Sequence, residues 1–347
     1  GTIEKVGADF VKPENKVSNG PFKLAENVPS SHIKLVKNAA HYDAGKVKLD
    51  AIMFYPTEDR SAALRRFQAG ELHLNDDVPT EQIKFIRENL KDQFRVAPYL
   101  GTYYFPINTK KAPFNDVRVR NALSMVIDRE FLAEEIWGGT MVPAYSFVPP
   151  GMQGYEPAYF TWKDKSPAER EEMAAKLLKD AGYGAGGKPI KLEIRYNTSE
   201  NHKKTSIAIA DMWKPFNVEV SLLNTDTKTH YAHLRDKGDY DIARAGWIGD
   251  YGDPQNFLFL MESDNSGFNY SNWSNAEFDK LMDMAAAEND LAKRASLLQK
   301  AEAINNAEEP NLALLYYASK NLVSPKVEGW VSNLKDVHPS RYLSLKP

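Results

Sequence analysis

Apolar residues recur along the chain with two periods, one typical of strands and the other typical of helices. Short β-branched or aromatic runs predict strands, and the segment 60–69 predicts a helix because Ala63, Leu64 and Phe67 share one face before Gly70. The predicted strands are 33–36, 51–55, 99–107, 190–196, 218–223, 240–247 and 313–323. The predicted helices are 60–69, 80–90, a segment with Val117, Ala122, Leu123 and Val126 at helical spacing, 167–181, 202–214, 228–237, 275–287 and 291–306.

Strands and helices alternate through the middle of the chain, which predicts an α/β fold. The chain has 347 residues, and single hydrophobic cores stop growing near roughly 250–300 residues, so we expect two cores. No internal repeat or low-complexity segment interrupts the pattern.

Composition narrows the classes of function. The formal net charge of −3 gives no electrostatic reason to expect a nucleic acid or a membrane surface as partner. No apolar run reaches the roughly 18 residues of a membrane span. The sequence contains no cysteine, which excludes disulfides, cysteine-ligated metals and a thiol nucleophile. The 17 Tyr, 16 Phe and 6 Trp supply both core residues and side chains suited to lining a binding cleft.

The segment Gly182–Lys188 matches two phosphate-binding patterns, GxGxxG and GxxxxGK. Both patterns require a strand before the glycine loop and a helix after it, because the helix N-terminus holds the phosphate. Here a predicted helix precedes the loop and a predicted strand follows. Pro189 also replaces the hydroxyl residue that would bind magnesium. We therefore predict a surface turn.

His230 and His233 lie three positions apart on a predicted helix, a spacing that could hold a metal. No Glu or Cys lies at a supporting spacing, so we interpret both as surface histidines and expect no metal site. No GxSxG segment is present, and no nucleophile, base and oxyanion hole can be assembled from the sequence. The sequence therefore predicts no catalytic residue.

Four ordered segments resemble one family. They are Ala243–Pro254 (ARAGWIGDYGDP), Ser18–Phe22 (SNGPF), Pro113–Arg120 (PFNDVRVR) continuing to Arg129, and Tyr196–Ser199 (YNTS) with His202–Lys204. Together they resemble the bacterial oligopeptide-binding proteins of the peptide/dipeptide/nickel ABC-transporter solute-binding family.

The resemblance implies a bilobal, periplasmic-binding-protein-like α/β fold with two lobes around a ligand cleft. Lobe I is expected to be discontinuous, formed by 1–100 plus 317–347, and lobe II is expected to comprise 101–316. The N-terminal stretch of the family has no counterpart here, so we expect lobe I to be incomplete. The chain would then be a fragment, a processed product or one half of a split protein, and in the last case a separate N-terminal chain completes lobe I.

The function that the resemblance implies is an extracytoplasmic, periplasmic solute-binding component of an ABC importer. Such a protein captures short peptides in the cleft between its lobes and delivers them to the permease subunits in the membrane. It uses no cofactor and no catalytic chemistry. Other solutes on the same scaffold stay open, namely a dipeptide, a murein peptide, a nickel complex or haem. A peptidase is the alternative from another class.

A receptor for varied peptides must bind what all peptides share, including the terminal ammonium and the terminal carboxylate. By resemblance, Asp250 binds the ammonium, where a charge-assisted hydrogen bond is strong; the alternative is that Asp250 caps the following turn. Arg244, Arg235 and His202 match carboxylate-binding residues of the family, and Arg is suited to bidentate pairing. From its charged surroundings alone, Arg235 could equally be a solvated helix residue.

Aromatic residues are expected to line the pockets for peptide side chains. Tyr99, Tyr104 and Trp247 match cleft residues of the family. Thr227 stands where the family has an aromatic residue, which would widen one pocket. Tyr103 alternates with Tyr104 on a predicted strand, so we expect it to point the other way, into the core.

Overall fold

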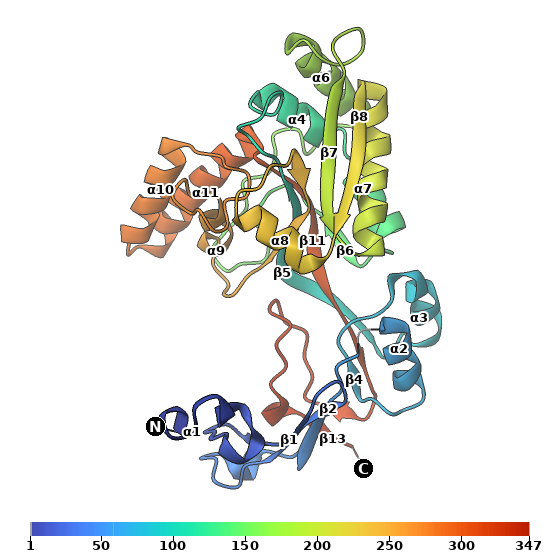
Figure 1. The fold of residues 1–347 in the computed structure, drawn as a ribbon, viewed down its shortest axis with the longest axis vertical. Coiled ribbons are helices and arrows are strands. Elements are labelled where there is room, and N and C mark those ends of the chain that lie inside the picture. Colours follow the sequence, from blue (N-terminus) through green and yellow to red (C-terminus); the bar gives the residue numbers. More distant parts are fainter. Residues whose placement is uncertain (1, 58, 347) are drawn as a thin grey trace. The chain divides into compact units, whose positions relative to one another are not determined.

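The computed structural model describes residues 2–57 and 59–346 and divides into two compact units (Figure 1). The first unit comprises Gly1–Ala97 and Ser319–Pro347, and the second comprises Pro98–Ala318. The chain passes from one unit to the other inside two long strands, β5 (Phe94–Pro106) and β11 (Asn311–Val323). No helix among the described residues is long and apolar enough to cross a membrane.

An antiparallel sheet in the first unit consists of β1 (Phe22–Val28), β2 (His32–Lys37) and β3 (Ala51–Phe54), in that order. Ile33 pairs with Phe54 and Leu35 pairs with Ile52, so these apolar side chains share one face. None of the residues in these three strands is fully buried, and Phe54 is 50% exposed. The apolar face of this sheet is therefore largely uncovered.

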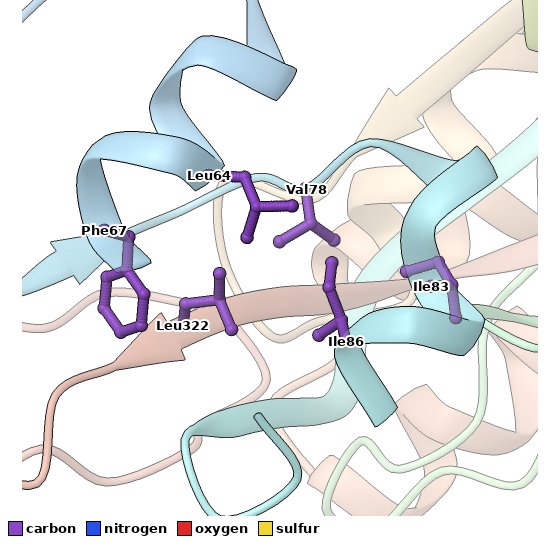
Figure 2. Packing of buried hydrophobic residues seen from close by; sticks show 6 residues of the cluster. All are labelled: Leu64, Phe67, Val78, Ile83, Ile86 and Leu322. Atoms are coloured by element: carbon purple, nitrogen blue, oxygen red, sulfur yellow. The ribbon is translucent and has the colours of Figure 1, made fainter. Parts of the chain in front are cut away.

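A small core in the same unit joins segments that are far apart in the sequence. Helices α2 (Arg60–Gln68) and α3 (Ile83–Asn89) pack around the end of β11, whose Leu322 pairs with Asn75 of β4 (Leu74–Asn75). Figure 2 shows the buried cluster, which consists of Leu64, Phe67, Val78, Ile83, Ile86 and Leu322.

Local sequence explains where α2 begins and ends. The Asp59 carboxylate accepts hydrogen bonds from the backbone N–H groups of Ser61 and Ala62, which fixes the N-terminus of the helix. Gly70 follows with φ of +76°, a conformation that favours glycine. The remaining elements of the unit are α1 (Thr2–Val6), η1 (Gly7–Val11), η2 (Pro13–Asn15), η3 (Ala44–Lys46), η4 (Thr80–Gln82), η8 (Ser340–Tyr342), β12 (Val327–Glu328) and β13 (Ser344–Leu345).

Two sheets organise the second unit. In one, β10 (Ala245–Ile248), β5 and β11 are neighbours in that order, and β6 (Met141–Pro143) also pairs with β11. In the other, β7 (Ile190–Asn197) lies between β8 (Val218–Thr225) and β9 (Ile242–Ala243), and all three run parallel. Helix α7 (Glu200–Trp213) packs on β7 and β8 (Figure 1).

The other helices of the second unit surround these sheets. Helix α6 (Pro167–Asp180) begins with a capping box between Ser166 and Glu169 and is followed by Gly182, whose φ is +87°. Helices α10 (Ala276–Ala287) and α11 (Leu291–Glu308) pack against each other. The remaining helices are α4 (Val117–Met125), α5 (Arg129–Phe131), η5 (Leu132–Ile136), η6 (Lys214–Phe216), α8 (Thr227–Arg235), α9 (Gln255–Leu258) and η7 (Phe259–Met261).

The predicted secondary structure is largely confirmed, including the order of helix, loop and strand around Gly182. The predicted strand 240–247 is wrong in one respect, because the chain leaves one sheet and enters the other within it. Residues Ile242–Ala243 pair with β7, whereas Ala245–Ile248 pair with β5. The single residue between the two strands is Arg244.

Candidate functional site

Arg244 lies where the chain crosses between the two sheets of the second unit. Its backbone N–H donates to the carbonyl oxygen of Arg195 on β7 at 2.7 Å. Its own carbonyl oxygen accepts from Nε2 of His230 on α8, also at 2.7 Å. These two bonds fix the backbone of Arg244 from both sides.

His230 is fully buried, so its interpretation as a surface histidine is wrong. Helix α8 packs on β7, and this contact places His230 against the strand, where its ring serves the Arg244 backbone. Burial, together with the charges of Arg195 and Arg244, lowers the pKa of His230 to about 4, although the hydrogen bond to the Arg244 carbonyl acts to raise it. The imidazole is therefore neutral at pH 7.

The side chain of Arg244 is held by hydroxyl and amide oxygens from three other segments. Its Nη1 donates to Asn197 Oδ1 at 3.1 Å and to the Tyr231 hydroxyl at 2.8 Å. Its Nη2 donates to the Tyr317 hydroxyl at 2.9 Å. The guanidinium also lies 4.9 Å from the ring centroid of Tyr103, within reach of a cation–π contact. We call Arg244, Asn197, Tyr103, Tyr231 and Tyr317 the Arg244 cluster.

The Arg244 cluster contains a positive charge and no negative one. Arg244 is only 8% exposed, and among the described residues no carboxylate forms an ion pair with it. Burial raises the pKa of the Tyr103 and Tyr317 hydroxyls, so both are neutral at pH 7. Burial acts to lower the pKa of Arg244, but the oxygens of Tyr317, Tyr231 and Tyr103 outweigh it, and the pKa lies above its ordinary value. A buried cation with only neutral partners is an arrangement that suits an anionic ligand group.

His202 adjoins the cluster through Tyr103. It lies on α7, is 8% exposed, and has its Nδ1 3.2 Å from the Tyr103 hydroxyl. Tyr103 is fully buried, as expected, yet it contacts two residues of the predicted site rather than core residues alone. Its ring also makes an edge contact with Trp137 at 5.4 Å.

Trp247 and Asp250 share one partner, Asn256. The Asn256 Oδ1 accepts from Trp247 Nε1 at 3.2 Å and from the backbone N–H of Asp250 at 2.9 Å. The Trp247 ring packs edge-on against Phe259 and Phe268, each at 5.4 Å. The tryptophan is thereby fixed on β10, and the Asp250 side chain, just beyond the strand, is exposed to solvent.

The other three predicted residues are not among the partners of Arg244. Tyr104 is 2% exposed and packs edge-on against Phe147 at 5.0 Å. Tyr99 is half-buried on β5, and Arg235 is exposed at the last residue of α8. The structure thus brings Arg244 and His202 together through Tyr103, and it ties Trp247 to Asp250 through Asn256.

Sequence reasoning did not assign Asn197, Tyr231, Tyr317 and Tyr103 to the site. Asn197 stands inside the YNTS segment, and Tyr317 stands on a predicted strand. Neither residue was predicted to belong to the site. Their convergence depends on four elements, β5, β7, α8 and β11, meeting at Arg244, which no local pattern encodes.

Two further features of the described residues bear on the chemistry that the chain supports. Within 2–57 and 59–346, no three His, Asp or Glu side chains gather as metal ligands. A shallow surface hollow of about 420 Å³ lies elsewhere on β7 and β8. It is lined by Lys191, Leu192, Glu193, Glu219, Val220, Ser221 and Asp241, and none of the predicted site residues is among them.

Comparison with known proteins points to one family of solute-binding proteins. Residues 3–269 match the family model of the bacterial extracellular solute-binding proteins, family 5. The periplasmic murein peptide-binding protein MppA of Escherichia coli is 37% identical over 96% of this chain and 62% of its own length. The periplasmic oligopeptide-binding protein OppA of Salmonella typhimurium is 37% identical over 94% of this chain and 60% of its own length.

A solved structure supports the same relationship. Haemophilus influenzae OppA in complex with the peptide RPPGFSPFR superposes with a TM-score of 0.82 at 33% identity, covering 99% of this chain and 68% of that one. The predicted periplasmic-binding-protein-like α/β fold is confirmed by this likeness. The chain spans about three fifths of the length of the curated relatives that it matches.

Proposed function

Since the chain belongs to the bacterial extracellular solute-binding proteins of family 5, we propose that it binds short peptides for an ABC importer. The observation that carries the proposal is Arg244, a buried guanidinium whose partners are all neutral. Such a group is stabilised by an anion that enters from solution, and every peptide carries one at its C-terminus. The peptide-binding names of the relatives support the same solute class.

In this proposal the two ends of the peptide are bound by opposite charges. Arg244 pairs with the terminal carboxylate, for which a planar guanidinium offers two parallel N–H donors. His202 adjoins Tyr103 and Arg235 is the last residue of α8, and both are further candidates to bind the terminal carboxylate. Asp250 pairs with the terminal ammonium. Asp250 is an exposed residue, and its backbone is held by Asn256.

The middle of the peptide meets aromatic side chains. Trp247 presents a ring held by Asn256, Phe259 and Phe268, and Tyr99 and Tyr104 lie on the neighbouring strand β5. Large aromatic rings provide contact area for peptides of different sequence. We propose that all seven residues serve the peptide site, although Tyr104 would do so from a largely buried position.

We further propose that the two compact units correspond to the two lobes of the family, and that another polypeptide completes the first. Support comes from the β1–β3 sheet, where Ile33 and Phe54 remain 38% and 50% exposed on an apolar face. Apolar sheet faces of this kind are normally covered in a folded domain. We propose a periplasmic location by analogy with the relatives. Permease subunits in the membrane are the partners that the proposed ABC importer requires.

Other solutes on this scaffold are alternatives, among them the murein peptide of the relative MppA, dipeptides, nickel complexes and haem. A peptide is favoured over nickel because no metal-ligand group is present among the described residues. A peptidase would need a nucleophile or metal next to Arg244, and the residues around it are tyrosines and an asparagine.

Native mass spectrometry of the protein, purified without refolding, tests the proposal. We expect co-purified masses of short peptides, which disappear after dialysis against denaturant and return when a peptide mixture is added. The mixture should be recovered uncleaved. Absence of peptide binding, or cleavage of the peptides, would rule the proposal out.

A further inference from the structure

A second buried arginine, Arg195, lies next to the Arg244 cluster. It is 6% exposed and stands two positions before Asn197 on β7, so the two side chains project from the same face of the strand. Asn197 accepts a hydrogen bond from Arg244. Strand β7 thus places the Arg195 guanidinium beside Asn197, the residue that binds the Arg244 guanidinium.

The hydrogen bonds of Arg195 show the direction of its side chain. Its Nη2 is 3.4 Å from the hydroxyl of Thr225 on β8, a long contact. Thr225 pairs in register with Asn197, so the guanidinium leans toward the end of β7 that carries the Arg244 cluster. At this end Asn197 Nδ2 also lies 3.4 Å from the hydroxyl of Thr227. The groups that Arg195 and Asn197 contact at this end of β7 are therefore small, neutral hydroxyls.

The charge of each arginine is not matched by an ion pair among the described residues. Among the described residues no carboxylate forms an ion pair with Arg195 or Arg244, and the buried Nε atom of each has no hydrogen-bond acceptor. His230, which lies close to both, is neutral at pH 7 because of its burial. Two like charges held in a poorly solvated place are unfavourable unless anions reach them. One terminal carboxylate neutralises only one of the two.

We propose that Arg195 and Arg244 together select peptides with an acidic last residue. Arg244 binds the terminal carboxylate, as in the proposed function on which this inference rests, and Arg195 binds the carboxylate of the last side chain. In this arrangement the last side chain lies against Thr225 and Thr227, the small residues that Arg195 and Asn197 contact. Arg195 is then a specificity-determining residue, and the ligand class narrows to peptides with two carboxylates at the C-terminal end.

The test compares two peptides of equal shape, Ala-Ala-Glu and Ala-Ala-Gln, by calorimetric titration of the whole chain at low ionic strength. We expect the Glu peptide to bind about 10-fold or more tightly, because only it offers a second anion to a poorly solvated cation. In Arg195→Gln we expect the affinities for the two peptides to differ by less than about threefold. The matched control is Lys191→Gln, an exposed cation on the same strand, which should keep the wild-type ratio.

The wild-type ratio alone decides the matter if Arg195→Gln does not fold. Equal binding of the two peptides would overturn the inference and leave the proposed function standing. A ratio that persists in folded Arg195→Gln, or that disappears equally in Lys191→Gln, would also overturn it. Binding of neither peptide would overturn the inference together with the proposed function.

Discussion

The guanidinium of Arg244 donates to the hydroxyl of Tyr317 at 2.9 Å, across 73 positions of the sequence. Tyr317 lies on β11, and Arg244 immediately precedes β10, the strand on the other side of β5 in the same sheet. The pairing of strands thus determines which tyrosine meets the arginine. Gly246, which pairs with Tyr103 on β5, provides the space in which the two side chains meet.

The first prediction concerns Gly246→Ala. An added Cβ would lie 2.5 Å from the Tyr317 hydroxyl and 3.3 Å from Arg244 Nη2, so these two side chains must separate. Such overpacking typically costs about 1–3 kcal/mol, and we expect peptide binding to weaken about 10-fold or more. Gly252→Ala is the control, because its Cβ would meet nothing within 4 Å. Titration with a neutral tripeptide measures both. Equal affinities in the two variants would show that the Arg244–Tyr317 contact is irrelevant to binding.

The second prediction concerns Asp250→Asn, which keeps the shape of the side chain and removes its charge. We expect peptides with a free N-terminus to bind about 10-fold or more weakly, since a charge-assisted hydrogen bond is lost. N-acetylation of the peptide should cost the wild type a similar factor and cost the variant little more. The four combinations can be measured by calorimetry. If the variant and N-acetylation together weaken binding by the product of their separate factors, Asp250 lies outside the site.

The third prediction concerns the pH dependence of stability. The fully buried Glu302 accepts from the Val148 N–H, the Ala158 N–H and the Tyr155 hydroxyl. Burial raises its pKa from 4.5 to about 7, despite these donors. Because the folded pKa is raised, this residue contributes stability that is fully present below pH 4.5 and is lost as the pH rises through 7. The shift corresponds to about 3 kcal/mol.

Glu302→Gln isolates this contribution. The free energy of unfolding of the wild type, relative to that of the variant, should fall as the pH is raised from 5 to 8. At pH 5 the variant should be less stable than the wild type by about 1–3 kcal/mol, because an amide cannot accept all three hydrogen bonds. Denaturant titrations at pH 5, 6, 7 and 8 measure both quantities. A constant difference between the two proteins would mean that the pKa of Glu302 is not raised.

Local patterns in the sequence were sufficient for most of the fold. Helix α2 illustrates this, because its apolar face, its Asp59 cap and Gly70 are all encoded within a dozen residues. The strand at 240–247 illustrates the limit. Its composition suits a strand throughout, but its two halves pair with β7 and β5, which lie far away in sequence. A break in a strand that comes from a change of pairing partner leaves no signal in the periodicity of apolar residues.

The candidate site could likewise be predicted only in part from the sequence. Resemblance pointed to Arg244, but burial of Arg244 beside Tyr103, Tyr231 and Tyr317 depends on β5, α8 and β11 meeting at one place. His230 was misassigned to the surface for this reason, since its burial comes from the packing of α8 on β7. Spacing along one helix could not reveal what covers that helix.

The most direct test of the account is whether Arg244 binds the terminal carboxylate. Wild type and Arg244→Gln are each titrated with one tripeptide in two forms, with a free and with an amidated C-terminus. Breaking a buried charge pair costs about 2–5 kcal/mol, so amidation should weaken wild-type binding roughly 30-fold or more. It should change binding to the variant by less than about threefold. Loss of the same large factor on amidation in both proteins would contradict the account, because the carboxylate would then be bound elsewhere.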